Sequence, residues 1–357
     1  MIETIKKPTK KLNLVQLFRG LAILFVMVGH INSIFNEQFG YDWLNMGSWG
    51  RTGGVDFFFV ISGFMIYYLY SKNIGIKGKA KDFLLKRCLR IFPLYWLVML
   101  ATVFLFFLFP QLGKGNETSI STIVKNVFLY PDTPILAVTW SLSHVVFFYI
   151  LFSLLIVKPK IFKPIIFTWI LISILIYSEL PLFESLNWFI FDIQNLELWA
   201  GAFTAYIVKN FNLKSGSFFI IIGAIGFILL WINNIYNFLE IDRRIYFCLA
   251  SLSIMIGIAS IDLKKEVKLP KIFSYFGDAS YSIFITHSPF LQFYVLIFEK
   301  TGILNILGYS ISMIFALLLA VISGCLTYSY LEKPLSIIMR KIFLNLPNKN
   351  LPLQKIS

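Results

Sequence analysis

The feature that most constrains this chain is a series of long apolar runs separated by short polar segments. A helix needs about 20 mostly apolar residues to cross a bilayer, and a spanning helix satisfies its own backbone hydrogen bonds where no water is present. We therefore predict an all-α, polytopic membrane protein with about ten transmembrane helices. The predicted spans are 12–33, 51–71, 91–110, 136–157, 164–180, 190–208, 217–236, 243–262, 279–299 and 305–331.

The composition supports a membrane protein. Only 14% of the 357 residues are charged, against roughly 25% in soluble domains, and the mean hydropathy is +0.76. The first apolar run is too long for a signal peptide, and no small-residue cleavage site follows it. No long polar linker divides the chain. We expect one membrane domain over residues 1–357, with spans over roughly 12–334 and short basic cytoplasmic tails at both ends.

The basic residues indicate the orientation of the chain. With a cytoplasmic N-terminus, 25 of the 32 Lys and Arg residues fall in inner segments and six in outer segments, while Arg19 lies within the first span. This asymmetry is a strong positive-inside pattern, and it predicts that both termini are cytoplasmic. The net charge of +14 is therefore a property of the topology, and nucleic acid is excluded as a partner. The three cysteines show no paired spacing, so neither a disulfide framework nor a zinc site is indicated.

Two costly polar residues share one face of the first span. Arg19 and His30 are 11 residues apart, which at 100° per residue returns to within about 20° of the same direction. The rise between them is ~16 Å, so we expect Arg19 toward the cytoplasm and His30 in the outer half. Charged groups at this depth are functional candidates. The alternative is that Arg19 extends to the inner interface and His30 is a satisfied interior histidine.

Three further titratable residues are predicted at the depth of His30. Asp56 enters from outside with the second span, His144 with the fourth and Glu197 with the sixth. A carboxylate beside a histidine orients the ring and supports the imidazolium form, which is a common arrangement for a general base. The alternative is a buried polar network that holds helices together.

The inner side carries a different pattern. Arg87 and Arg90 stand where the third span leaves the cytoplasm, and their spacing of three places them on one edge of a helix. Guanidinium groups suit bidentate phosphate contacts. His287 is expected in the inner half of the ninth span or near the midplane. At Glu332, the YSYLEKPL segment predicts a helix end followed by a proline stop.

Six sequence blocks, in this order, resemble the acyltransferase 3 family of integral membrane acyltransferases. Members acetylate exopolysaccharides, O-antigens and similar surface glycans. No single block is decisive, but together they extend from residue 12 to residue 334. The blocks are LNLVQLFRGLAILFVMVGH, GGVDFFFVISGF, KRCLRIFPLYWL, TWSLSH, FGDASYSIFITH and LEKP.

The resemblance implies transfer of an acyl group from cytoplasmic acyl-CoA, most simply acetyl-CoA, to a hydroxyl of a polysaccharide or lipid-linked sugar. It implies a multi-pass protein of the cell membrane with no permanently bound cofactor. Arg19 and His30 match the family's Arg-to-His pair, in which the histidine is the catalytic base. Arg87 and Arg90 match the family's Arg pair, which is implied to hold the phosphates of the donor. We predict no metal site, a catalytic group of His30, Asp56, His144 and Glu197, and a donor-binding group of Arg19, Arg87, Arg90 and His287.

One position departs from the family pattern. Many members have Glu where this chain has Val145, so Glu197 or Asp56 is expected to orient His30 instead, with Glu197 preferred. Two other functions stay open. One alternative is a catalytically impaired member of the family. The other is a glycolipid transporter whose polar residues line a translocation path. The absence of an obvious inverted repeat favours a donor–acceptor reaction over transport.

Overall fold

Each of the ten predicted apolar runs coincides with an α-helix. The computed structural model describes residues 10–344 except 50, 111, 112, 114, 179–188 and 214. The outermost parts of both predicted tails, and the last two residues of the predicted span 164–180, lie outside the described residues. The ten helices are α1 (Asn13–Phe39), α2 (Gly54–Tyr70), α3 (Lys79–Leu108), α5 (Thr139–Val157), α6 (Pro159–Tyr177), α7 (Ile193–Asn210), α8 (Gly216–Tyr236), α9 (Arg243–Lys264), α10 (Lys271–Lys300) and α11 (Ile303–Thr327).

Nine helical segments in the described part of the chain are long and apolar enough to cross a membrane. The exception among the ten predicted spans is α7, which has 18 residues but carries Gln194, Asn195 and Glu197 in its first two turns. The prediction of an all-α membrane protein is thus confirmed, and the composition criterion supports nine spans rather than ten. The cytoplasmic location of the termini stays a prediction.

The polar side chains of α7 are buried because this helix packs closely on α2. A Cβ atom added to Gly63 would overlap the carbonyl group of Leu198, and one added to Gly201 would overlap that of Val60. The two helix backbones therefore touch, and the first turns of α7 are enclosed by protein. Gln194, Asn195 and Glu197 are all buried, which explains how a helix of modest hydropathy is accommodated inside the bundle.

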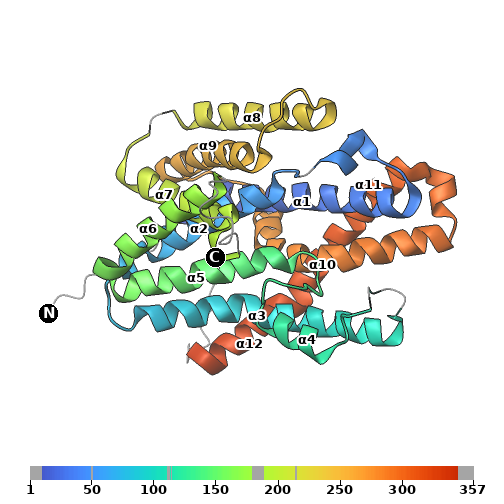
Figure 1. Cartoon of the computed structure of the whole chain (residues 1–357), viewed down its shortest axis with the longest axis horizontal. Coiled ribbons are helices and arrows are strands. Elements are labelled where there is room, and N and C mark those ends of the chain that lie inside the picture. Colours follow the sequence, from blue (N-terminus) through green and yellow to red (C-terminus); the bar gives the residue numbers. More distant parts are fainter. Residues whose placement is uncertain are drawn as a thin grey trace.

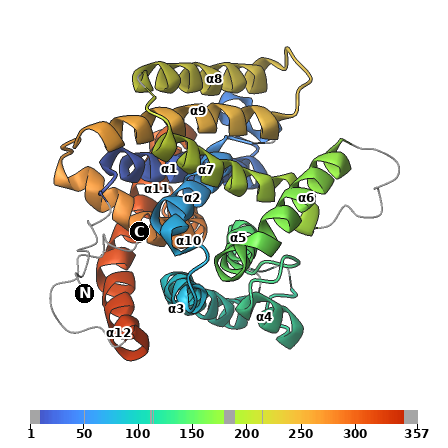
Figure 2. The same cartoon turned by 90° about the vertical axis from the view of Figure 1, so that its left-hand side faces the viewer.

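The long helices lie side by side, and the two ends of the bundle differ (Figure 1). At one end, which we call the basic end, the N-terminal segment meets the ends of α2 and α9. Tyr68 Oη donates to the Lys10 carbonyl, and Lys10 Nζ donates to the Leu263 carbonyl. Figure 2 looks onto this side of the molecule. The opposite end carries the short helices η1 (Trp43–Ser48) and α4 (Ile120–Val127).

The C-terminal helix does not stop where the sequence predicted. α11 passes through one π-helical turn, Tyr328–Glu332, into α12 (Lys333–Leu344). Pro334 falls in the first turn of α12, directly after the π-helical turn. The predicted proline stop was therefore wrong. The π turn matters for function because it brings Glu332 to a buried position, with 4% of its surface exposed, and because α12 packs against α3.

Candidate active site

The helix α1 presents Arg19 and His30 to different cavities. The helix has no break between the two residues, so they are separated by ~16 Å along its axis. Arg19 lines one cavity nearer the basic end. His30 lines two others nearer the opposite end. The expectation that these two residues work at different depths is consistent with this arrangement.

His30 stands where two cavities meet. The smaller, of about 200 Å³, is also lined by Trp49, Arg51, Asp56 and Trp140. The larger, of about 520 Å³, lies between α1, α3, α10 and the segment around α4. Its walls are partly polar and partly apolar. The polar part includes carboxyl, hydroxyl and amide groups from Glu37, Glu117, Asp132, Thr133, Ser288 and Gln292. A hydroxyl-bearing molecule entering the larger cavity from the end of the bundle would meet His30.

The nearest titratable ring to His30 is His287. The two ring centroids are 5.2 Å apart, and His287 is fully buried. Its Nδ1 atom lies 2.6 Å from the Phe284 carbonyl oxygen, and a carbonyl only accepts, so Nδ1 carries the proton. The Nε2 atom is therefore an acceptor, and no partner for it is found in the described part of the chain. The sequence grouped His287 with the donor-binding arginines, but the structure places it against His30.

The two predicted carboxylates face an arginine instead of His30. Asp56 Oδ1 accepts from Arg51 Nη1 at 2.5 Å, and Glu197 Oε1 lies 3.9 Å from the same nitrogen. Asp56 shares the smaller cavity with His30. Among the described residues, no hydrogen bond joins His30 to either carboxylate. Sequence analysis missed Arg51 as a member of this group, although its position five residues before Asp56 was a usable indication.

His144 belongs to the contact between α5 and α7. Its Nδ1 atom lies 2.8 Å from Asn195 Oδ1, and its ring packs against Phe59, Trp140 and Phe189. It lines neither cavity of His30. The structure therefore does not bring His144 to His30, and the alternative of a buried polar network describes its surroundings.

The three predicted arginines converge on one cavity of about 80 Å³ near the basic end. Arg19 Nη2 donates to the Gly277 carbonyl, while its Nε has no partner among the residues described. Arg87 Nη2 donates to Tyr70 Oη at 2.8 Å. Arg90 Nη1 donates to Glu332 Oε1 at 2.5 Å. We call this site the arginine cavity. The spacing of Arg87 and Arg90 predicted their shared face, which the structure confirms.

Two residues of the arginine cavity region were missed by sequence analysis. Glu332 pairs with Arg90, and its second oxygen accepts from Ser282 Oγ at 2.5 Å. Arg340, on α12, is 9% exposed and lies close enough to Arg87 and Arg90 for their charges to repel. No hydrogen-bond acceptor for Arg340 is found in the described part of the chain. The sequence predicts a short basic tail in this part of the chain, and no pattern in it indicates that Arg340 belongs to a site.

An aromatic pair lies between the arginine cavity and His287. Phe58 lines the arginine cavity and stacks on Phe284, with ring centroids 5.2 Å apart and planes inclined by 8°. The ring centroid of Phe284 in turn lies 6.0 Å from the ring centroid of His287. Val145 also lines the arginine cavity. A glutamate at position 145 would therefore face the arginines rather than His30.

Comparison with known proteins gives a match to one family model and to several named relatives. A family model described as an acyltransferase domain matches residues 13–325. The exopolysaccharide production protein ExoZ of Rhizobium meliloti is 27% identical over 299 residues, which cover 80% of this chain and 89% of ExoZ. A Staphylococcus aureus protein with the provisional name O-acetyltransferase is 26% identical over 88% of this chain, which spans only 56% of that protein's length. No solved structure matches the chain significantly.

Proposed function

Because the chain belongs to this acyltransferase family and is a membrane acyltransferase of the non-aminoacyl type, we propose that it acetylates an exported or cell-surface polysaccharide, or its lipid-linked precursor. The donor is cytoplasmic acetyl-CoA, and the acceptor is a sugar hydroxyl. The name of the Rhizobium relative, which refers to exopolysaccharide production, supports this substrate class. The protein acts as one domain in the cell membrane, with both termini in the cytoplasm.

The observation that carries the proposal is the division of polar groups along α1. Arg19 reaches the arginine cavity, and His30, ~16 Å further along the helix, reaches the two cavities of the opposite end. A donor of that length could be held by its phosphates at one level and present its thioester at the other. A transporter would need no such pairing of an arginine cluster with a histidine.

The arginines supply the donor site. Guanidinium groups bind phosphate oxygens through paired hydrogen bonds. Arg19, Arg87 and Arg90 line one small cavity, and Glu332 is the carboxylate partner of Arg90. Arg340 does not line this cavity, but it lies close enough to Arg87 and Arg90 for their charges to repel. In this proposal the phosphates of acetyl-CoA compete with Glu332 for Arg90. The pantetheine arm then extends past Phe58 toward His30.

The reaction proposed at His30 is a direct acyl transfer. The imidazole takes the proton of the acceptor hydroxyl while the hydroxyl oxygen attacks the thioester carbonyl carbon. The carbon–sulfur bond breaks, and the CoA thiolate leaves and receives a proton. Removal of a proton by a positioned histidine contributes about 10²–10⁴-fold to such reactions. A relay, in which His30 itself carries the acyl group before the sugar attacks, uses the same residue.

His287 takes the positioning role that sequence analysis gave to a carboxylate. Its Nε2 is an acceptor without a partner among the described residues, and the centroids of the two histidine rings are 5.2 Å apart. A hydrogen bond accepted from the His30 N–H would fix which nitrogen of His30 carries the lone pair. Asp56 and Arg51, which line the same cavity as His30, would contact the acceptor. Glu197 and His144 support the helices behind them.

The proposal is tested by two measurements. Mass spectrometry of cell-surface polysaccharide, with and without the gene, should show the loss of one acetyl mass per modified residue. Purified protein should transfer acetyl groups from acetyl-CoA to polysaccharide isolated from the deletion strain. Movement of glycolipid across vesicles in the absence of any acyl donor, with no acetyl mass lost from the cells, would contradict the proposal and favour a transporter.

A further inference from the structure

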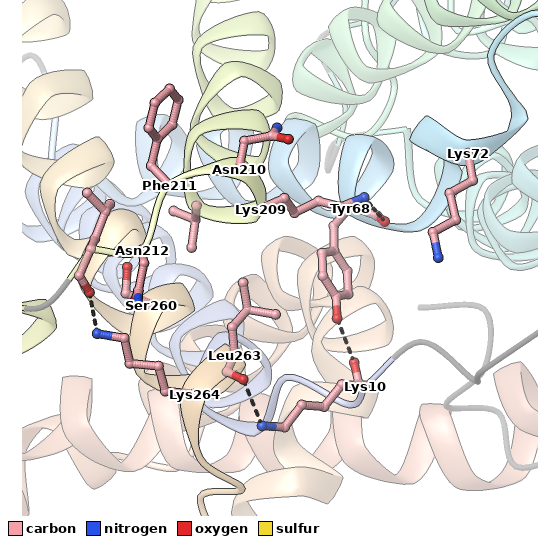
Figure 3. Close-up of a pocket in the computed structure, with 12 residues that line it drawn as sticks. Lys10, Tyr68, Lys72, Lys209, Asn210, Phe211, Asn212, Ser260, Leu263 and Lys264 are labelled. Carbon is pink, nitrogen blue, oxygen red and sulfur yellow. Dashed lines mark hydrogen bonds between the residues drawn. The ribbon is translucent and has the colours of Figure 1, made fainter.

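A second polar cavity lies at the basic end, and no residue that lines it also lines the arginine cavity. Its volume is about 540 Å³. It opens among the ends of α2, α7 and α9 and the segment before α1 (Figure 3). None of the predicted functional residues is part of it. We call it the lysine pocket.

The lysine pocket carries four ammonium groups and no carboxylate among the residues that line it. The lysines are Lys10, Lys72, Lys209 and Lys264, and they come from four separate segments of the chain (Figure 3). Four positive charges around one hollow produce a field that attracts anions and is only partly screened by water. The pocket therefore favours a negatively charged ligand.

Helix capping accounts for only part of this arrangement. Lys264 Nζ donates to the Leu213 carbonyl at 2.5 Å, and Lys10 Nζ donates to the Leu263 carbonyl at 3.1 Å, as lysines near helix C-termini commonly do. Each ammonium group has three N–H donors, so two remain on each of these residues. Lys72 has no acceptor in the part of the chain that the structure describes.

A buried hydroxyl adds a second, independent indication. Ser260 lines the lysine pocket and is 4% exposed. Its Oγ atom has no hydrogen-bond partner among the described residues. A buried hydroxyl without a partner costs free energy, and that cost is removed if the hydroxyl donates to an oxygen of a ligand. Together with the ammonium groups, this points to a ligand rich in anionic oxygen.

Exposed aromatic side chains begin at the rim of the pocket. Phe211 lines it and is 56% exposed. On the preceding turns of α7, Phe203 and Tyr206 are 62% and 43% exposed and stack on each other. These side chains form an apolar surface that leads from the lysines along the helix. A ligand with an anionic head and hydrocarbon chains would match both parts.

We propose that the lysine pocket binds the phosphate head of an anionic phospholipid, with its acyl chains lying along α7. Basic clusters at the ends of membrane helices attract anionic lipids of the facing leaflet. The proposal does not depend on the acyltransferase function, because it rests on residues outside that site. A soluble phosphate could offer the same head group, and the experiment separates the two sources.

The test is native mass spectrometry of the full-length protein in detergent, with added phosphatidylglycerol or phosphatidylcholine of identical chains. We expect preferential retention of phosphatidylglycerol. Lys72→Gln should weaken it about fivefold, and Lys72→Gln with Lys264→Gln about 25-fold. The matched control is Lys160→Gln with Lys163→Gln, which removes two exposed lysines of α6 outside the pocket.

Three results would overturn the proposal. One is equal retention of the two lipids by the unchanged protein. Another is an equal loss of phosphatidylglycerol in the pocket and control variants. The third is displacement of the lipid preference by millimolar pyrophosphate that itself binds with the same dependence on Lys72, which would assign the pocket to a soluble phosphate. Lys72 is exposed and makes no hydrogen bond or ion pair within the described part of the chain, so Lys72→Gln tests the pocket without removing such an interaction from the fold.

Discussion

The two functional regions along α1 differ in how much of their space is already filled. Around His30, cavities of about 200 and 520 Å³ meet, and no hydrogen bond to the His30 ring is found among the described residues. Around Arg19, the cavity is only about 80 Å³, and Arg19, Arg87 and Arg90 each donate to a protein acceptor. One region is open to a ligand, while the other is closed on its own side chains.

This difference predicts that the two proposed substrates bind in different ways. In the proposed reaction, an acceptor sugar would enter the cavities at His30, where no hydrogen bond between the ring and the described residues has to be broken. The proposed donor would have to replace existing contacts of the arginines, above all the Arg90–Glu332 pair, with contacts to its own phosphates. Breaking one charged hydrogen bond to form another leaves only a small net gain. The account therefore predicts modest donor affinity set by the arginines, and a rate of transfer set by His30.

The largest expected effect is that of His30→Ala. Loss of the general base should lower kcat for acetyl transfer by about 10²–10⁴-fold. Donor binding should stay unchanged, because the arginine cavity lies ~16 Å away along α1. The measurement is the rate of acetyl transfer from acetyl-CoA by purified protein at saturating donor. Full activity in this variant would remove His30 as the base.

Arg340→Gln should weaken the binding of the donor near the arginine cavity. A charged hydrogen bond to phosphate contributes about 1.5–3 kcal/mol, so the KM for acetyl-CoA should rise roughly ten- to hundredfold while kcat changes little. Lys341→Gln is the matched control, because the neighbouring lysine is exposed. A similar KM in the two variants would show that α12 takes no part in donor binding.

His287→Phe should reduce kcat about five- to tenfold, because it removes the acceptor nitrogen proposed to accept a neutral hydrogen bond from His30 during the reaction. It should leave the KM for the donor unchanged. The pH dependence of kcat should shift as well, since the protonation of His30 loses a neighbour. His287→Gln keeps an acceptor oxygen in place of Nε2 and should restore most of the rate. Equal losses in both variants, with no shift in the pH profile, would reduce His287 to a packing role.

The smallest expected effect belongs to Val145→Glu. The new carboxylate would face the arginine cavity and compete with the donor phosphates. The affinity for acetyl-CoA should therefore fall by no more than about fivefold. Donor binding by equilibrium dialysis measures this directly. A large gain in activity would instead mean that the natural chain is an impaired enzyme, and that position 145 serves His30.

Local patterns predicted more of this molecule than long-range contacts did. Apolar runs predicted the ten long helices, but not the shorter α4 and α12. Helical spacing predicted the shared face of Arg87 and Arg90. Both features depend on neighbours along the chain. The partners of those residues do not follow from the sequence. Glu332 lies 242 residues from Arg90, and His287 is brought to His30 by the packing of α10 on α1.

The depth of a residue along its span does not determine which neighbours its side chain meets. The sequence predicted four titratable residues at one depth in the membrane, but it did not indicate which sides of their helices face one another. In the structure Arg51 engages Asp56 and approaches Glu197, and Asn195 engages His144. The absence of His144 from the cavities of His30 follows from the rotation of α5, which no hydropathy pattern contains.

The most direct test of the two-region account is the binding of acetyl-CoA, measured by titration calorimetry, in two variants side by side. The first is His30→Ala. The second combines Arg90→Gln with Glu332→Gln, which removes both charges of the buried pair and leaves two amides that can still pair. The account predicts unchanged donor affinity in the first variant and an affinity at least about tenfold weaker in the second. Donor binding lost in His30→Ala, or preserved in the amide pair, would contradict it.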